Sequence, residues 1–119
     1  LGGNKPAYGF NATGSSWLPQ PASFAALARS EQEGVAGSTL ELYKTLVRLR
    51  SEFSLGTGNL SWLDGYGENV LAFRNERIEV LANFGNDSVS IDEQRVLLRS
   101  GKKVPGLIQA NSSCWLLRL

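Results

Sequence analysis

Residues 37–53, GSTLELYKTLVRLRSEF, contain the clearest structural signal in the chain. Ser38 and Glu41 match a capping box, in which the Ser38 hydroxyl accepts the Glu41 amide N–H and the Glu41 carboxylate accepts the Ser38 amide N–H. Side chains then recur at helical spacing at Leu40, Tyr43, Leu46, Val47 and Arg50, and Phe53 closes this stripe. The stretch therefore predicts a helix over residues 38–53.

This helix separates two kinds of sequence. Leu42 and Leu49 lie off its main stripe, so we expect apolar neighbours on two of its sides. Glu41 lies in its first turn and the basic residues come later, as the helix macrodipole favours. A Gly- and Pro-rich loop region precedes the helix, and segments typical of short strands follow it.

Composition and charge exclude several classes of function. The 119 residues are enough for one domain, or for a domain with an appendage, and 42% hydrophobic content disfavours wholesale disorder. The net charge is +1 and the basic residues are scattered, so no nucleic-acid partner is expected. The chain contains no histidine, which excludes Ser-His-Asp and Cys-His catalysis and histidine metal sites.

The sequence shows neither a membrane segment nor a targeting signal. No apolar run approaches the roughly 18 residues that a membrane helix needs. Without a signal-peptide pattern, we expect a cytoplasmic location and no membrane partner. The chain begins at Leu1 and has no methionine, so we interpret it as a piece of a longer protein. Its single cysteine, Cys114, lies in an apolar run and is expected to be a buried small hydrophobe.

The residues before the helix predict a long loop and one short helix. Residues 1–22 show neither helical nor strand periodicity. Large apolar groups in this loop predict packing against a body within or outside the chain; they are Tyr8, Phe10 and Trp17. Residues 22–33 are Ala-rich with apolar groups at helical spacing, which predicts a short helix ended by Gly34.

After Phe53 the pattern is typical of short strands. The expected strands are residues 60–63, 69–74, 77–84, 89–91, 95–98, 107–108 and 114–117. We expect the second and third to form an antiparallel hairpin, with Val70 and Leu71 the most buried residues of the second. In the third, Ile78, Val80, Ala82 and Phe84 alternate with Arg77, Glu79, Leu81 and Asn83. Strands at this spacing predict a small antiparallel β-sandwich.

No group of residues has the pattern of an active site. The closest acidic pairs are Asp64 with Glu68 and Asp87 with Asp92, and each lies in or beside a turn, where surface positions are expected. Glu76 and Glu79 are assigned to the solvated face of the hairpin. Gly56, Gly58, Gly65 and Gly67 lack the strand-to-helix context of a phosphate loop. The four glycosylation sequons begin at Asn11, Asn59, Asn86 and Asn111 and are attributed to chance.

Five blocks, in order, resemble the C-terminal end of bacterial-type α-glucosidases of the α-amylase superfamily (glycoside hydrolase family 13). The first block is Tyr8-Gly9-Phe10 with Gly14, and the second is Trp17-Leu18-Pro19-Gln20-Pro21. The third is Gly37-Ser38-Thr39-Leu40 together with Leu42-Tyr43-Lys44, Leu46 and Leu49-Arg50. The fourth is Asn69-Val70-Leu71-Ala72-Phe73-Arg74, and the fifth is Val80-Leu81-Ala82-Asn83-Phe84-Gly85. The resemblance implies an α+β fragment. Residues 1–54 would be the end of a (β/α)8 barrel, namely a loop, a short helix at about 22–33 and the final helix at about 38–53. Residues 55–119 would be the C-terminal antiparallel β-sandwich.

The resemblance also implies a function for the parent protein. The parent would be a retaining hydrolase of terminal α-linked glucose in oligosaccharides, with this chain structural and inactive by itself. The family's nucleophile Asp, acid/base Glu and stabilising Asp lie on earlier barrel strands and have no counterpart here. No catalytic, cofactor-binding or metal-binding residue is therefore assigned, and no cofactor is expected. The expected partners are the barrel of the same protein and the parent's oligosaccharide substrate.

Three alternatives stay open at this stage. A sugar isomerase or transglycosylase of the same superfamily would share the barrel, and the heavy chain of an amino-acid transporter would resemble it without being a hydrolase. A free-standing carbohydrate-binding β module would need a row of exposed aromatic side chains on one sheet face. We assign Trp62, Tyr66, Phe73, Phe84 and Trp115 mostly to the core, which disfavours this third alternative.

Overall fold

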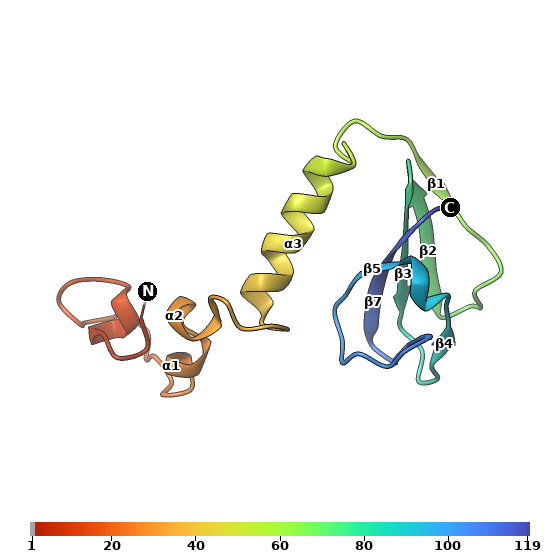
Figure 1. Cartoon of the computed structure of the whole chain (residues 1–119). Coiled ribbons are helices and arrows are strands. Elements are labelled where there is room, and N and C mark those ends of the chain that lie inside the picture. The colour runs from red at the N-terminus through yellow and green to blue at the C-terminus, as the bar shows by residue number, and fades with distance from the viewer. Residues whose placement is uncertain (1) are drawn as a thin grey trace. The chain divides into compact units, whose positions relative to one another are not determined.

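A computed structural model describes residues 2–119 (Figure 1). The chain divides into two compact units, Leu1–Lys44 and Thr45–Leu119. The division falls inside helix α3, Thr39–Glu52, so that the first turns of this helix belong to the first unit and the remainder to the second.

The first unit holds short helices and loops. These are the 3-10 helix η1 (Pro6–Gly9) and the α-helices α1 (Phe24–Leu27) and α2 (Arg29–Gln32). The single helix predicted over residues 22–33 is wrong, because Ala28 is extended and separates α1 from α2. The Gln32 side-chain amide donates to the Leu27 carbonyl at 2.6 Å, while the Glu31 amide donates to the Ala28 carbonyl. These bonds replace the backbone bond that a continuous helix would make to Leu27.

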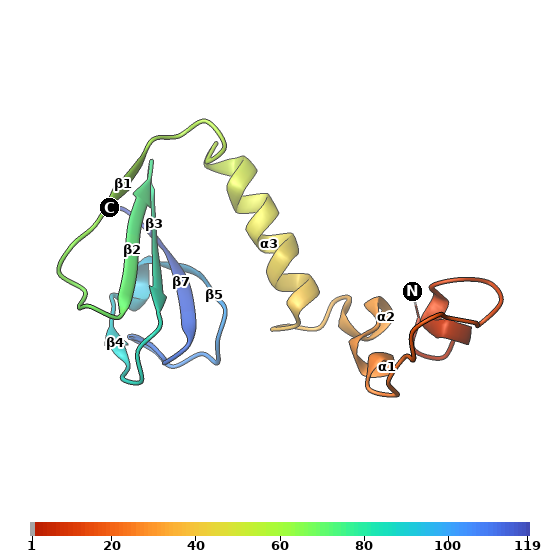
Figure 2. The same ribbon diagram turned by 180° about the vertical axis from the view of Figure 1, so that it is seen from behind.

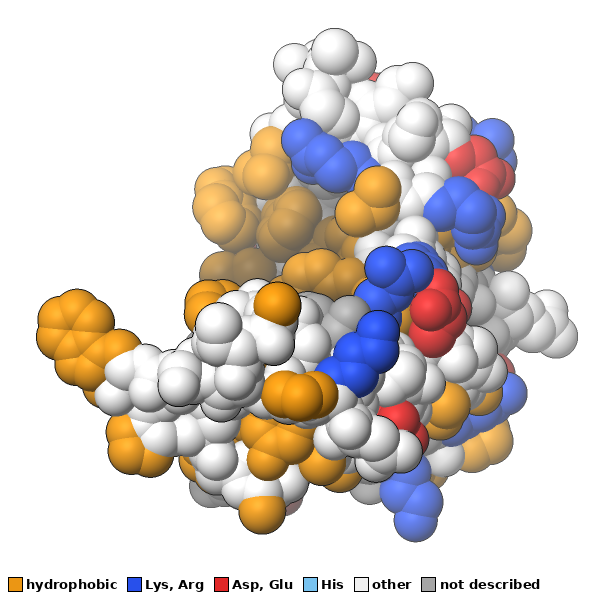
Figure 3. All heavy atoms as spheres, turned by 90° about the vertical axis from the view of Figure 1, so that its left-hand side faces the viewer, with side chains coloured by type: hydrophobic (Ala, Val, Ile, Leu, Met, Phe, Trp, Pro, Cys, Tyr) orange, Lys and Arg blue, Asp and Glu red, His pale blue; other side chains and the backbone are white. Residues whose placement is uncertain are grey.

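The aromatic residues of the first unit differ in burial. Tyr8 packs edge to face on Phe24, with ring centroids 6.3 Å apart, and its hydroxyl donates to the Pro21 carbonyl. Phe10 is 73% exposed and Trp17 is 99% exposed. Figure 3 shows exposed hydrophobic side chains interspersed with polar and charged ones. Within the described chain, Tyr8 therefore has the predicted packing and the other two aromatic residues do not.

Helix α3 starts with half of the predicted capping box. The Glu41 amide donates to the Ser38 hydroxyl at 3.3 Å, as predicted. The Glu41 carboxylate accepts from the Gly34 amide at 3.0 Å and not from Ser38, so this half of the prediction is wrong. The Ser38 amide is already bonded to the Val35 carbonyl within the turn that precedes the helix.

The buried face of α3 differs from the predicted stripe. Leu49, which was placed off the stripe, is the buried residue of the helix, whereas Tyr43 and Val47 are exposed. Leu55 is buried just beyond the helix, and its carbonyl accepts from the Asn75 side-chain amide of strand β2 at 3.0 Å. In the second unit, tertiary packing at the end of the helix decides which face is covered.

The second unit is built on an antiparallel sheet. Its strands are β1 (Leu60–Trp62), β2 (Val70–Asn75), β3 (Ile78–Asn83), β5 (Val96–Arg99) and β7 (Ser112–Leu117), in the order β1-β2-β3-β7-β5. Strands β4 (Val89–Ser90) and β6 (Leu107–Ile108) form a separate pair, and the 3-10 helix η2 (Glu93–Arg95) precedes β5. Figure 2 shows β2, β3 and β7 side by side. All seven predicted strands are present, with ends shifted by a few residues.

The predicted hairpin of β2 and β3 is confirmed. The strands pair from Val70 opposite Asn83 to Asn75 opposite Ile78. Two residues connect them, and Glu76 has a φ of 53°, in the left-handed region.

The core cluster lies on the sheet face that carries Leu81. Its buried side chains are Ala72, Leu81, Ile108, Cys114 and Leu116. Ala72 pairs with Leu81, and Leu81 pairs with Cys114, so these three side chains line up across β2, β3 and β7. The prediction that Val70 and Leu71 are the most buried residues of β2 is wrong, because Ala72 is the residue in register with this row.

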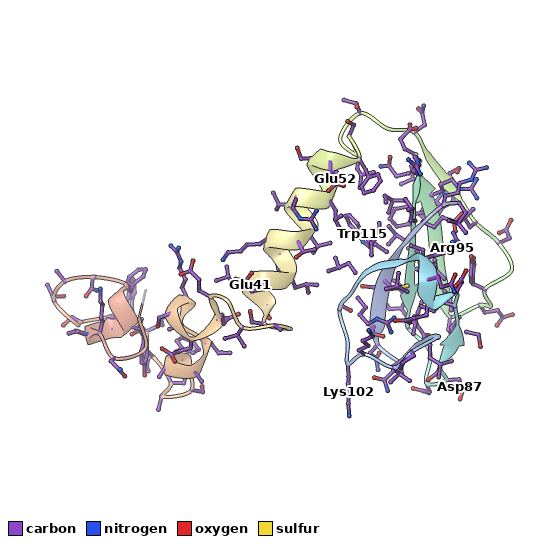
Figure 4. All side chains as sticks on the ribbon, in the orientation of Figure 1. Glu41, Glu52, Asp87, Arg95, Lys102 and Trp115 are labelled. Atoms are coloured by element: carbon purple, nitrogen blue, oxygen red, sulfur yellow. The ribbon has the colours of Figure 1, made fainter. Side chains whose placement is uncertain are left out.

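The buried residues of β3 include Glu79, which was assigned to a solvated face. Glu79, Leu81 and Asn83 alternate along β3 and are buried, and Ile78 is buried as well. Phe84, just beyond the strand, is exposed. The opposite face carries a row in register, Trp62, Phe73, Val80, Trp115 and Leu98. Figure 4 shows Arg95 and Trp115 on opposite sides of the sheet. The fold is a small α+β arrangement with a five-stranded antiparallel sheet, compatible with a β-sandwich-like domain.

Candidate functional site

The candidate site is a groove of ≈ 470 Å³ at the edge of the sheet, beside β1 and the start of β2. Its lining residues are Trp62, Leu63, Asp64, Glu68, Asn69, Val70, Leu71, Ala72 and Phe84. The set combines two aromatic rings, four aliphatic side chains and three polar side chains. It thereby brings together Asp64 and Glu68, one of the acidic pairs singled out in the sequence.

Backbone hydrogen bonds hold the walls of this groove in place. The Leu63 amide donates to the Ala72 carbonyl at 3.0 Å, and the Phe84 amide donates to the Asn69 carbonyl at 2.8 Å. The connection from β1 to β2 turns at Gly65 and Gly67, whose φ values of 93° and 96° favour glycine. Asp64 and Glu68 flank these glycines, so the turn sets where the two carboxylates lie.

Trp62 and Phe84 are the large exposed groups of the groove. Trp62 is 66% exposed and Phe84 is 69% exposed, so their assignment to the core is wrong. The Trp62 ring packs edge to face on Phe73, with centroids 5.9 Å apart and an interplanar angle of 78°. The contact with Phe73 therefore restrains the Trp62 indole, while most of the Trp62 side chain remains accessible.

Glu79 lies in a buried ionic cluster on the core face. It is 6% exposed, so its assignment to the solvated face of the hairpin is wrong, whereas Glu76 is exposed as expected. Arg74 donates to one Glu79 carboxylate oxygen at 2.9 and 3.2 Å, and Arg95 pairs with the other. Burial acts to raise the Glu79 pKa, but the hydrogen bonds from Arg95 and Arg74 outweigh it and the pKa is lowered. Such a carboxylate is a structural anion and a poor general acid.

A second cluster forms around Glu93. The Gly106 amide donates to its carboxylate at 2.9 Å, and Arg99 donates to the same oxygen. The Glu93 pKa is lowered by the Gly106 hydrogen bond first, and then by Arg99, against the opposing effect of burial. Arg99 also donates to the carbonyls of Val104 and Leu107. The cluster ties η2 and β5 to the segment that leads into β6, which is a structural role.

The remaining residues singled out in the sequence lie apart from the groove. Asp92 caps η2 by accepting from the Gln94 amide, and Asp87 is exposed. Gly58 lies where an added Cβ would come within 2.1 Å of the Asn75 side-chain oxygen, so this glycine serves close packing. Cys114 is buried as predicted, and burial raises the pKa of its thiol to about 11. Lys102 and Lys103 are exposed, and Figure 4 shows Lys102 pointing away from the sheet.

Residues 2–119 contain no group of three or more Cys, Asp or Glu side chains placed to hold a metal ion. Among the helices described, none has both the length and the apolar character required to cross a membrane. A scan against protein-family models finds no match, and a search of curated proteins finds none either.

The exposure of Trp62 and Phe84 was missed in the sequence, although a local signal for it exists. Trp62 lies on a three-residue strand that occupies one edge of the sheet. An edge strand this short has a neighbour on one side, so a large ring on it is only partly covered. Phe84 lies directly beyond the end of β3, before the turn at Gly85.

Proposed function

We propose that this chain is the C-terminal, non-catalytic part of a cytoplasmic α-glucosidase-like glycoside hydrolase. In the parent, a carboxylate on the barrel would attack the anomeric carbon while a second acid protonates the departing glycosidic oxygen. Water, deprotonated by that second residue, would then break the glycosyl–enzyme bond. The chain itself would stabilise the barrel by packing against it.

The observation that carries the proposal is the exposure of large apolar side chains within the resembling blocks. Phe10, Trp17, Leu18 and Tyr43 are 73%, 99%, 73% and 62% exposed. All four belong to blocks that the resemblance assigns to the end of the barrel, where the rest of the barrel would cover them. Exposure of several large apolar side chains fits a surface that another body covers in the parent.

The order of the elements supports the same proposal. A Gly-Ser-capped helix of 14 residues is followed by an antiparallel sheet of five strands. This is the order that the resemblance implies for the final barrel helix and the C-terminal β domain.

The coding sequence upstream of Leu1 provides the first test. We expect barrel strands that carry an Asp, a Glu and a second Asp at the family's positions. A barrel without these acids, or a membrane helix ahead of it, would favour a transporter heavy chain. An open reading frame that starts at Leu1 would contradict the proposal.

A reconstitution experiment tests the packing role directly. The upstream barrel segment is co-expressed with the chain, and we expect the two to co-purify and to hydrolyse an aryl α-glucoside. The double variant Phe10→Ser/Trp17→Ser is expected to lose co-purification because it removes apolar side chains from the proposed contact. Phe84→Ser, a matched exposed aromatic of the second unit, is the control and should still co-purify. Turnover by the purified 119-residue chain alone would overturn the non-catalytic assignment.

A further inference from the structure

We propose that the groove between Trp62 and Phe84 binds a neutral oligosaccharide. This inference is independent of the proposed function, because it concerns binding by the second unit and requires no barrel. It is carried by three observations: two exposed aromatic rings, a set of hydrogen-bonding side chains beside them, and a groove of suitable size.

The aromatic rings provide surfaces for a sugar ring. A pyranose presents a patch of C–H groups on its face, and such patches pack on flat aromatic side chains. Trp62 and Phe84 are both more than half exposed, and Leu71 between their strands is 40% exposed. The edge-to-face contact with Phe73 restrains the Trp62 ring, so less side-chain entropy is lost when a ligand binds.

The polar residues of the groove match hydroxyl groups. Carboxylate oxygens of Asp64 and Glu68 accept hydrogen bonds, and the Asn69 side-chain amide both donates and accepts. A pair of neighbouring sugar hydroxyls can therefore bond to a carboxylate or to the amide. The hydrogen bond from the Phe84 amide to the Asn69 carbonyl holds this polar edge close to an aromatic ring.

The charge of the groove disfavours anionic ligands. Its lining contains two carboxylates and neither lysine nor arginine, so a phosphate, a nucleic acid or an acidic peptide would be repelled. The volume of ≈ 470 Å³ falls in the range of roughly 300–1,000 Å³ that is typical of small-ligand sites. An uncharged, hydroxyl-rich ligand with apolar ring faces satisfies both conditions.

From the sequence, the aromatic residues of the sheet were assigned mostly to the core, which disfavoured a carbohydrate-binding surface. In the structure Trp62, Phe73 and Trp115 lie on one face in a single row, with Trp62 at its exposed end. Trp62 therefore provides an accessible aromatic surface at this edge of the sheet.

The test is a titration of the full chain, followed by ¹H–¹⁵N NMR. The chain has three tryptophans, so three indole N–H signals report on Trp17, Trp62 and Trp115 separately. The probes are maltotetraose, cellotetraose and the tetramer of β-1,4-linked N-acetylglucosamine. We expect at least one of them to shift the Trp62 signal saturably at millimolar concentration, while the fully exposed Trp17 signal stays in place.

Variants assign the binding to the groove. Trp62→Ala is expected to abolish binding, and Phe84→Ala to weaken it about tenfold, in keeping with the contribution of one aromatic contact. Trp17→Ala is the matched control and should leave the affinity unchanged. Trp62→Phe and Asp64→Asn disturb the fold least, and we expect the first to retain part of the binding and the second to weaken it.

Three outcomes would overturn the inference. One is the absence of a saturable Trp62 shift with all of the tetrasaccharides at about 20 mM, well above the expected dissociation constant. Another is binding that persists unchanged in both Trp62→Ala and Asp64→Asn. The third is a Trp62 shift produced by a lysine-rich peptide and by none of the sugars, which would assign the groove to a cationic partner.

Discussion

At the scale of single residues, the buried carboxylate of Glu79 is paired with two partly buried arginines of the second unit. Glu79 is bonded to Arg74 and Arg95, and Arg95 also donates to the Leu117 carbonyl at 2.8 Å. These bonds join β2, η2, β3 and the end of β7. Because the two arginines keep partial contact with water, the cluster costs less to bury than a fully enclosed ion pair.

Glu79→Gln tests the contribution of this cluster. Removing the carboxylate leaves two arginines without a counter-charge, so we expect a loss of about 1–3 kcal/mol in the free energy of unfolding. Urea unfolding measures it. The control is Glu52→Gln, because Glu52 forms an exposed pair with Arg48 at 2.8 Å and such pairs contribute little. Equal losses in the two variants would contradict the structural role of Glu79.

The pH dependence of stability follows from the same group. The Glu79 pKa in the folded state lies below its ordinary value of 4.5, so the unfolded state binds more protons as the pH falls. Its contribution is complete above the ordinary pKa and is lost as the pH decreases through the lowered one. We expect the urea midpoint to decrease below about pH 4.5. A decrease of the same size in Glu79→Gln would show that other carboxylates are responsible.

At the scale of elements, helix α3 depends on the cap at Ser38. The Ser38 hydroxyl accepts from the Glu41 amide and donates to the Gln32 carbonyl at 2.8 Å, so it joins the helix start to α2. The Gln32 side chain adds a second link by accepting from the Leu40 amide at 3.1 Å. The start of the helix is therefore defined by the first unit, and not by the capping box alone.

Ser38→Ala is expected to lower the free energy of unfolding by about 1 kcal/mol, the usual cost of losing an N-cap. Hydrogen exchange at the Glu41 amide should accelerate as well, since its acceptor is removed. Ser51→Ala is the matched control, because Ser51 is exposed within the same helix and alanine favours helical structure there. If Ser38→Ala changed neither the free energy of unfolding nor the exchange rate of the Glu41 amide, the role of Ser38 as the helix cap would be contradicted.

At the scale of the whole molecule, the two units differ in how much side chain they bury. In the described part of the first unit, Ala28 is the buried residue. The second unit has the cluster around Leu81 and the ladders of β3 with β2 and β7. Local opening requires less free energy where fewer apolar groups are buried.

Hydrogen exchange measured by mass spectrometry is expected to show this difference. Amides of β3 and β7 should exchange slowest, because these central strands are paired on both sides. Peptides from residues 2–37 should exchange within the earliest time points. If the two units were protected to the same degree, the first unit would have a stable structure of its own, and its exposed apolar groups would need another explanation.

The sequence by itself determined helix α3, the strands of the second unit and their order along the chain. Helical spacing predicted α3 to within one residue at each end, and alternation with turn residues predicted the seven strands and the β2–β3 hairpin. These features depend on local periodicity and on turn chemistry, which neighbouring residues along the chain specify.

Only the tertiary structure decided which faces are buried. In α3 the buried residue is Leu49 and not the predicted stripe, and in β2 it is Ala72 and not Val70 or Leu71. Glu79 is buried and paired with two arginines. The exposure of Trp62 and Phe84, and hence the groove, was decided in the same way. Alternation along a strand gives two candidate faces, and the choice between them depends on which neighbouring strand and loop cover each one.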